Sequence, residues 1–520
     1  MKSKHSLILF CLGLGVGVLA AVWVRVPGYM DASYYYTTAL SLARGDGFIE
    51  PYVWNYLGNP AGIPHPSHQY WMPLSTILAA VPLRLGGESF RLAQAVFVLL
   101  TACIPVVTSR LAHTLTGSRT SALQAGFLAL IPGFYLPFFV TTDNFVVYAL
   151  TGTAALFLMA NASERSSAWL WAAAGGAVGL CHLARADGLL FFVPAVVLLF
   201  LSRRGIRLMP FFLTGYFLLM APWWFRNWST FGSMGGGAGT DMVWMTDYNQ
   251  LFRYPPDTLG MDSWVQMDAR ELIRVRLQAA GSNFLSLVAV NGAVVLGPFM
   301  VLGGIKLWHR RMVRAAAVYL VVLYLVMSFV FPLAGYRGSF FHSGAALMPL
   351  GWALVPAGFR AAIEWGVEGR GWKQRRAVMM FAPLLITTVL GLTIWNYWNR
   401  VVGSDPGRLQ WEELHELYAE VGAYVGNSPG NAAVKDPPTF HAATGRSSVV
   451  IPYGGLEALR AVCERYDVDR VVLDKDHPEG FAPLYRSPGQ YDWLKPVYSW
   501  EMADGSPVYL LEVVEDKVNK

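Results

Sequence analysis

Residues 29–36 read YMDASYYY and follow directly on the first long apolar run of this 520-residue chain. The same polar segment closes with PHPSHQYWMP at positions 64–73. An acid, clustered aromatic rings, two histidines and several prolines therefore gather where the chain has just left an apolar run. A simple membrane anchor would not require such a loop. The fold and the chemistry are best predicted by working outward from this segment.

The surrounding chain has the composition of a membrane protein. It is 54% hydrophobic and 14% charged, whereas soluble proteins carry about 25% charged residues. About 20 apolar residues cross a bilayer as a helix, so the first run is predicted to span rather than to be a cleaved signal peptide. About eleven runs qualify, near 6–25, 88–112, 121–138, 142–160, 167–183, 187–202, 207–226, 285–307, 313–333, 339–361 and 376–398.

The basic residues orient these spans. Arginine and lysine gather in every second loop, and the positive-inside rule assigns such loops to the cytoplasm. We therefore expect a multi-pass protein of the plasma (inner) membrane, with a cytoplasmic N-terminus, an odd number of spans and an extracytoplasmic C-terminus. Loops 26–87 and 227–284 then lie outside with the tail. Because the basic residues sit between apolar runs, a nucleic-acid partner is excluded, and membrane lipids are the expected surroundings.

The chain divides into two predicted domains, a transmembrane domain over 1–403 and a soluble α/β domain over 404–520. Extended runs at 432–434, 448–451, 471–473, 496–500 and 508–514 surround a helical stretch at 456–466, a pattern typical of a small α/β unit. In loop 227–284 a glycine cluster at 232–239 is compatible with a flexible tether or with a mobile lid.

Two acids are the candidate catalytic residues. Asp31 lies a few residues beyond the first span, and Asp143 opens the fourth span on the same side. Each can be read as a helix cap. A cap can also serve as a base, because poor solvation beside the tyrosines would raise the pKa of Asp31. An ionisable group at the edge of a span, such as Asp143, is usually functional.

Arginines at the outer ends of spans are candidate phosphate ligands, since guanidinium matches phosphate with two hydrogen bonds. They are Arg185, which forms a pair with Asp187 in the plainer reading, Arg226, and Arg337 beside Tyr336. Arg226 and Arg337 can also be read as anchors that reach the membrane surface.

A metal site is considered and not predicted. His65 and His68 are three residues apart and could join Asp31 around a divalent ion, but hydrogen bonds to a ligand or within the loop are preferred. The four cysteines show neither a disulfide framework nor zinc spacing.

These patches occur in a recognisable order. Residues 31–36, 39–47, 68–73, 185–188, 223–227, 231–232 and 336–337 resemble the recurrent patches of the GT-C superfamily of membrane glycosyltransferases. The likeness is greatest to bacterial relatives of the protein O-mannosyltransferases and of the aminoarabinose transferase that modifies lipid A. It covers the spans, and the tail is only loosely similar.

The resemblance implies an inverting transfer from a polyprenyl-phosphate-linked sugar to an extracytoplasmic hydroxyl of a protein, lipid or glycan. The family's presumed base falls on Asp31, and its second-loop acid falls on Asp143. No cofactor is implied with certainty. The substrate-binding residues it implies are Tyr35, His65, His68, Trp71, Arg185, Asp187, Arg226, Tyr336 and Arg337.

This sequence departs from the family in two places. Ala32 stands where many members carry a second acid, which leaves a metal requirement open. His68 or Gln69 stands near the position where some members carry a lysine, which leaves the phosphate ligand open.

A transporter or flippase of lipid-linked sugars and a non-catalytic scaffold are the rival functions. A transporter is expected to show inverted repeats and broken helices at the membrane midplane, and the sequence indicates neither. Clustering of Asp31, Asp143 and the arginines would favour the enzyme, and their dispersal would favour the scaffold.

Overall fold

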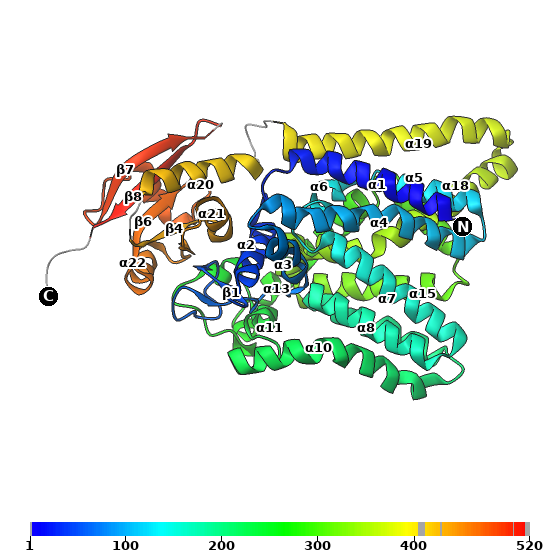
Figure 1. Cartoon of the computed structure of the whole chain (residues 1–520), viewed down its shortest axis with the longest axis horizontal. Helices are drawn as coiled ribbons and strands as arrows, with labels where there is room; N and C mark the ends of the chain where they lie inside the picture. Colours follow the sequence, from blue (N-terminus) through cyan, green and yellow to red (C-terminus); the bar gives the residue numbers. More distant parts are fainter. Residues whose placement is uncertain (1–2, 404–410, 427–428, 503, 515–520) are drawn as a thin grey trace.

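The computed structural model describes residues 3–403, 411–426, 429–502 and 504–514. Long helices run side by side along the longest axis of the molecule, and an α/β region lies at one end of this bundle (Figure 1). The N-terminus lies at the opposite end. The shorter elements of loops 26–87 and 227–284 gather between the bundle and the α/β region (Figure 1).

The bundle contains seven helical stretches, among the described residues, that are long and apolar enough to cross a membrane. They are α1 (Ser3–Trp23), α4 (Phe90–Thr116), α7 (Phe145–Arg165), η3 with α10 (Gly205–Phe231), α15 with η7 (Arg311–Val330), the kinked stretch Pro332–Arg370 that ends in α18 (Met348–Arg370), and α19 with η10 (Gln374–Val402). Three shorter apolar helices accompany them: α3 (Leu74–Gly86), α8 (Ala168–Ala184) and η2 with α9 (Ala186–Phe200). The prediction of a mainly helical, multi-pass membrane protein is confirmed.

Two predicted spans are broken, contrary to the expectation of uninterrupted helices. The run at 121–138 forms α5 (Arg119–Leu128) and a second piece, Gly133–Phe139, bent by 49°. The run at 285–307 begins inside α13 (Ala269–Ser286) and resumes as α14 (Gly297–Lys306). The two breaks meet, because the Asn291 amide donates to the Tyr135 hydroxyl over 2.9 Å. Buried polar side chains of this kind make interrupted helices tolerable inside a membrane protein.

The C-terminal region is an α/β unit, as predicted. Its order is α20 (Trp411–Val425), β4 (Asn431–Val434), α21 (Pro437–Thr444), β5 (Ser448–Val450), α22 (Gly455–Tyr466), β6 (Val468–Leu473), α23 (Ala482–Arg486), β7 (Leu494–Glu501) and β8 (Pro507–Val513). The six-stranded sheet has the order β2-β5-β4-β6-β8-β7, in which β2 is Tyr52–Val53. The pairs among its first four strands are parallel, and β8 and β7 are antiparallel additions.

One strand of that sheet comes from the far end of the chain. Strand β2 (Tyr52–Val53), in loop 26–87, pairs in parallel with β5, so that Val53 lies opposite Val449. The neighbouring Tyr56 is fully buried, and its hydroxyl donates to the Val450 carbonyl over 2.5 Å. Apolar burial therefore recruits part of the loop into the α/β core, so that the core is built from both predicted domains.

Loop 227–284 is also docked on this assembly. The Tyr453 backbone N–H donates to the Phe252 carbonyl over 2.7 Å. Gly236 lies over Gln69, where a Cβ would approach the Gln69 carbonyl oxygen to 3.1 Å, and its φ of +79° also favours glycine. The glycine cluster thus permits a close approach to the Pro- and Trp-rich segment of the first loop.

Candidate active site

Helix α2 (Met30–Arg44) carries the first candidate acid. The helix begins one residue before Asp31, its N-cap is Tyr29, and the cap makes no side-chain hydrogen bond. The interpretation of Asp31 as the cap is therefore wrong. Asp31 lies in the first turn, where the partial positive charge of the helix N-terminus favours an anion. Its carboxylate projects from this first turn instead of closing the helix.

Asp143 lies in the turn before α7 and is fully buried. One carboxylate oxygen, Oδ1, accepts from the backbone N–H of Asn144 over 2.6 Å. The other, Oδ2, accepts from the Tyr29 hydroxyl over 2.6 Å and lies 3.1 Å from His342 Nε2. Three donors around one carboxylate match what a buried anion requires.

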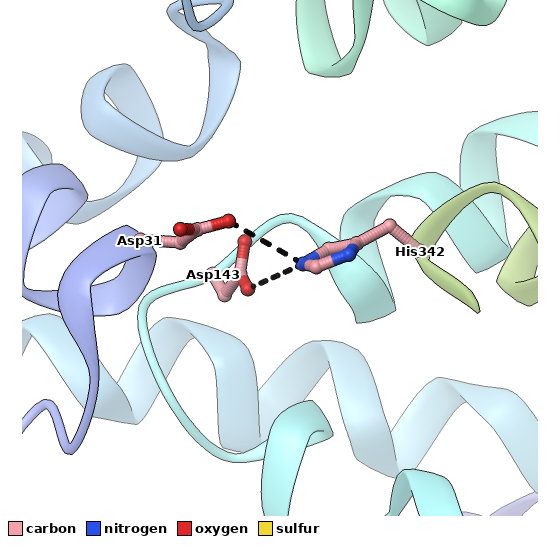
Figure 2. A group of neighbouring side chains, drawn as sticks. All are labelled: Asp31, Asp143 and His342. Atoms are coloured by element: carbon pink, nitrogen blue, oxygen red, sulfur yellow. Dashed lines mark hydrogen bonds and ion pairs between the residues drawn. The ribbon is translucent and has the colours of Figure 1, made fainter. Parts of the chain in front are cut away.

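His342, in α17 (Phe340–Gly344), joins the two acids. Its Nε2 lies 3.6 Å from Asp31 Oδ2 and 3.1 Å from Asp143 Oδ2 (Figure 2). Its Nδ1 lies 3.0 Å from the Gly338 carbonyl oxygen, which can only accept. Both ring nitrogens of His342 therefore face hydrogen-bond acceptors.

The surroundings shift the pKa values of the two carboxyl groups in opposite directions. Burial and the charge of Asp143 raise the pKa of Asp31 to about 7, against the opposing charges of His342 and Arg185. Burial also opposes the ionisation of Asp143, but His342 and the donors Tyr29 and Asn144 outweigh it and lower the pKa of Asp143. Two acids with separated pKa values are suited to different roles, one as a proton acceptor near neutral pH and one as a fixed anion.

Arg185 belongs to the same neighbourhood. Its guanidinium pairs with Asp187 over 2.9 Å, and Asp187 also accepts from the Ser343 hydroxyl, next to His342. The charge of Arg185 acts on Asp31 and on Tyr35. Tyr35 is buried, and its hydroxyl accepts from the Asn144 amide over 3.1 Å. The structure therefore brings together five of the predicted site residues: Asp31, Asp143, Arg185, Asp187 and Tyr35.

The two loop histidines make their hydrogen bonds within loop 26–87. His68 is buried, with Nδ1 2.7 Å from the Ser67 hydroxyl and Nε2 3.0 Å from the Thr76 hydroxyl. His65 Nε2 lies 2.9 Å from the Tyr52 carbonyl oxygen and 3.3 Å from the Glu50 carboxylate. In these positions both rings order the loop.

Arg226 and Trp71 also support this loop. The Arg226 guanidinium donates to the Ser67 carbonyl over 2.8 Å and lies 5.0 Å from the centre of a Trp223 ring. Trp71 stacks on Trp54 with ring centres 4.1 Å apart. The arginine and the indole stiffen the segment that follows the helix of Asp31.

Arg337 meets the second loop. Its guanidinium lies 5.4 Å from the ring centre of Tyr336 and 5.0 Å from that of Tyr248, in η5 (Tyr248–Phe252). Burial, and then the charge of Asp31, raise the pKa of Tyr248 to about 12. Arg337 and Tyr248 thus border the site from the side of loop 227–284.

Sequence reasoning missed His342, Tyr29 and Tyr248. A signal existed for His342, because an ionisable residue in the apolar run FFHSG is unusual in a predicted span. Nothing in the sequence distinguishes Tyr29 from the other aromatic residues beside Asp31.

A divalent ion fits this cluster. In the part of the chain that the structure describes, one group of three histidine, cysteine, aspartate or glutamate side chains has ligand atoms that all lie within 4.8 Å of one another. This group is Asp31, Asp143 and His342. Two carboxylate oxygens and one imidazole nitrogen suit zinc or manganese. The grouping considered from the sequence does not form, since His65 and His68 are bonded within the loop.

Comparison with known proteins identifies the architecture. The chain aligns with ArnT from Cupriavidus metallidurans bound to undecaprenyl phosphate over 99% of both chains, at 15% identity and a TM-score of 0.58. The chain has a GT-C fold. The predicted resemblance to GT-C membrane glycosyltransferases is thereby confirmed.

Further comparisons agree with the GT-C fold. Archaeal oligosaccharyltransferase AglB from Archaeoglobus fulgidus, in complex with an inhibitory peptide and a dolichol-phosphate, matches at 14% identity and a TM-score of 0.58, over 100% of this chain and 75% of AglB. Residues 65–225 match the family described as dolichyl-phosphate-mannose-protein mannosyltransferase. The sequence matches none of the curated proteins.

Proposed function

We propose that the protein is a membrane glycosyltransferase that moves a sugar from a polyprenyl-phosphate donor to an acceptor hydroxyl with inversion. The single observation that carries the proposal is the cluster of Asp31, Asp143 and His342 (Figure 2). It lies on a GT-C fold, with Arg185 close enough for its charge to act on Asp31. The clustering also favours an enzyme over a scaffold.

Asp31 is the general base in this proposal. A carboxylate with a pKa of about 7 is partly ionised at neutral pH and is a stronger base than an exposed aspartate. It takes the proton of the acceptor hydroxyl as the oxygen attacks the anomeric carbon, on the face opposite the phosphate. A positioned base contributes about 10²–10⁴ in rate.

Asp143 keeps the histidine in place. Its carboxylate holds His342 Nε2 at 3.1 Å, and the ring in turn lies beside Asp31. This arrangement offsets part of the repulsion between the two acids and fixes the direction of the Asp31 carboxylate. Fixed charges act strongly in a site that excludes water.

Arg185 is the proposed phosphate ligand. Departure of the polyprenyl phosphate leaves negative charge on the phosphate oxygens, and a planar guanidinium binds such oxygens in pairs. Two residues orient the guanidinium. Asp187 Oδ1 lies 2.9 Å from Arg185 Nε, and the ring centre of Tyr148 lies 5.9 Å from Arg185 Cζ. Arg337 is a second candidate, at the border with loop 227–284.

The site is proposed to face the extracytoplasmic side of the plasma membrane. The basic residues concentrate in the loops at the other end of the bundle, as the positive-inside rule requires of cytoplasmic loops. The acceptor class stays open among proteins, lipids and glycans.

The same cluster supports a metal-assisted version of this reaction. Asp31, Asp143 and His342 would hold the ion, which would supply positive charge beside the donor phosphate. Treatment with a chelator, followed by readdition of zinc or manganese, separates the two versions. Activity that survives chelation supports Asp31 as the base.

The test uses the purified protein in lipid nanodiscs. We expect the wild type to consume one of a panel of labelled polyprenyl-phosphate sugars and to release the polyprenyl phosphate. A transporter would move the donor between leaflets without breaking the bond to the phosphate. If no donor loses its sugar, in the presence of protein, lipid and glycan acceptors, the proposal is wrong.

A further inference from the structure

The α/β region touches the residues next to the candidate base. Trp411, the first residue of α20, lies with its ring centre 5.2 Å from that of Tyr29 and 5.7 Å from that of Phe138. The following residue, Glu412, pairs with Arg25 over 3.5 Å. The start of α20 is thus seated against the segment that enters α2.

The sequence leaves room for this contact. A Cβ on Gly28 would come within 2.5 Å of the Trp411 ring, and the φ of Gly28 is +103°. Both the close approach and the backbone conformation call for glycine. The indole could not reach Tyr29 if position 28 carried a side chain.

Tyr29 connects this contact to the carboxylates. Its hydroxyl donates to Asp143 Oδ2 over 2.6 Å. Its ring is held at the edge by Phe138, with centres 5.6 Å apart, and on another side by Trp411. Removal of Trp411 would open one side of the ring and allow the hydroxyl to swing away from Asp143.

We propose that Trp411 is a positioning residue of the active site, which holds Tyr29 in the orientation from which its hydroxyl donates to Asp143. The α/β region would then complete the site. This inference rests on the proposed function for its catalytic consequence. A displacement of about 1 Å at a reacting group can cost on the order of a hundredfold in rate, so a loss of roughly tenfold to a hundredfold is expected.

Other contacts keep the region docked without Trp411. The hydroxyls of Ser33 and Thr439 lie 2.9 Å apart, and β2 pairs with β5. Trp411→Ala should therefore leave the fold intact. The conservative Trp411→Phe keeps an aromatic face toward Tyr29 and should retain most of the activity.

The test is a double-mutant cycle of Trp411→Ala, Tyr29→Phe and the combined variant, with Tyr424→Ala at the other end of α20 as the control. Each variant is assayed for kcat, for the KM of the donor and for its melting temperature in detergent. We expect Trp411→Ala to lower kcat with little change in KM. The combined variant should be no worse than Tyr29→Phe, because both changes remove the same hydrogen bond. The control should match the wild type in kcat and in KM.

Additive losses in the cycle, or an unchanged kcat in Trp411→Ala, would overturn the inference. The melting temperatures provide the same cycle without a substrate. The combined variant should lose less stability than the sum of the losses in Trp411→Ala and Tyr29→Phe. If the wild type consumes no donor, the proposed function fails, and the thermal cycle still decides whether Trp411 acts through Tyr29.

Discussion

The substitution Asp31→Asn removes one charge and keeps the shape of the side chain. The Asp31 side chain is 28% exposed, and the protein around the rest of it, together with the charge of Asp143, opposes its ionisation. Asparagine cannot accept the proton of an acceptor hydroxyl as a carboxylate does. We expect transfer to fall by about 10²–10⁴, the usual contribution of a general base.

The same substitution should stabilise the protein at alkaline pH. The pKa of Asp31 rises from an ordinary value of about 3.9 to about 7. At about 1.36 kcal/mol for each pH unit, ionisation in the folded state costs at most roughly 4 kcal/mol. Because the folded pKa is raised, the stability that the neutral carboxyl provides is present below pH 4 and is lost as pH rises through 7. Asparagine is neutral at every pH, so the stability of Asp31→Asn does not fall as the pH rises through 7.

Two measurements check this reasoning. Donor consumption by the wild type should rise with pH through about 7, as Asp31 loses its proton, whereas the low activity of the variant should not show this rise. The melting temperature of the variant should exceed that of the wild type by more at pH 8 than at pH 5. The control is Asp46→Asn, an exposed acid beyond the end of α2. Turnover like that of the wild type in Asp31→Asn would refute the assignment of Asp31 as the base. A difference in melting temperature between variant and wild type that is the same at pH 5 and pH 8 would refute the electrostatic argument.

Three further predictions concern the surroundings of the site. Arg185→Lys keeps the charge but loses the planar fork, so the KM of the donor should rise about tenfold; an unchanged KM would exclude a phosphate contact. His342→Ala removes the group between the two acids and should lower kcat by at least tenfold, and a pH–rate profile identical to that of the wild type would argue against its role. Tyr56→Phe leaves the buried Val450 carbonyl without its donor and should cost about 1–3 kcal/mol in stability. Its control, Tyr424→Phe, should melt like the wild type, and equal melting temperatures for all three proteins would contradict the prediction.

The sequence was sufficient for the general architecture. Apolar runs of spanning length predicted the helical bundle, and short extended runs around a helical stretch predicted the α/β region. Both patterns depend on local composition, which determines whether a segment is buried in lipid or packed in a sheet. Asp31 and Asp143 stand out in the sequence because each acid lies at the edge of an apolar run, where a charge is costly.

Non-local packing could not be predicted in this way. His342 lies 199 residues from Asp143, and no spacing rule links them. The breaks near Asn291 and Tyr135 depend on two side chains from separate segments that satisfy one another over 2.9 Å. Strand β2 has only two residues, too few to show an alternating pattern, and it is a strand because β5 lies beside it.

The pairing of β2 with β5 also constrains how the protein is made. Tyr52 leaves the ribosome nearly 400 residues before its partner Ser448, and every later membrane span is synthesised in the interval. Until β5 is made, strand β2 has no partner strand, and Val53 and Tyr56 are not buried by the α/β core. Membrane insertion must therefore be finished before the sheet can close, and completion of the last domain coincides with the final ordering of the first loop.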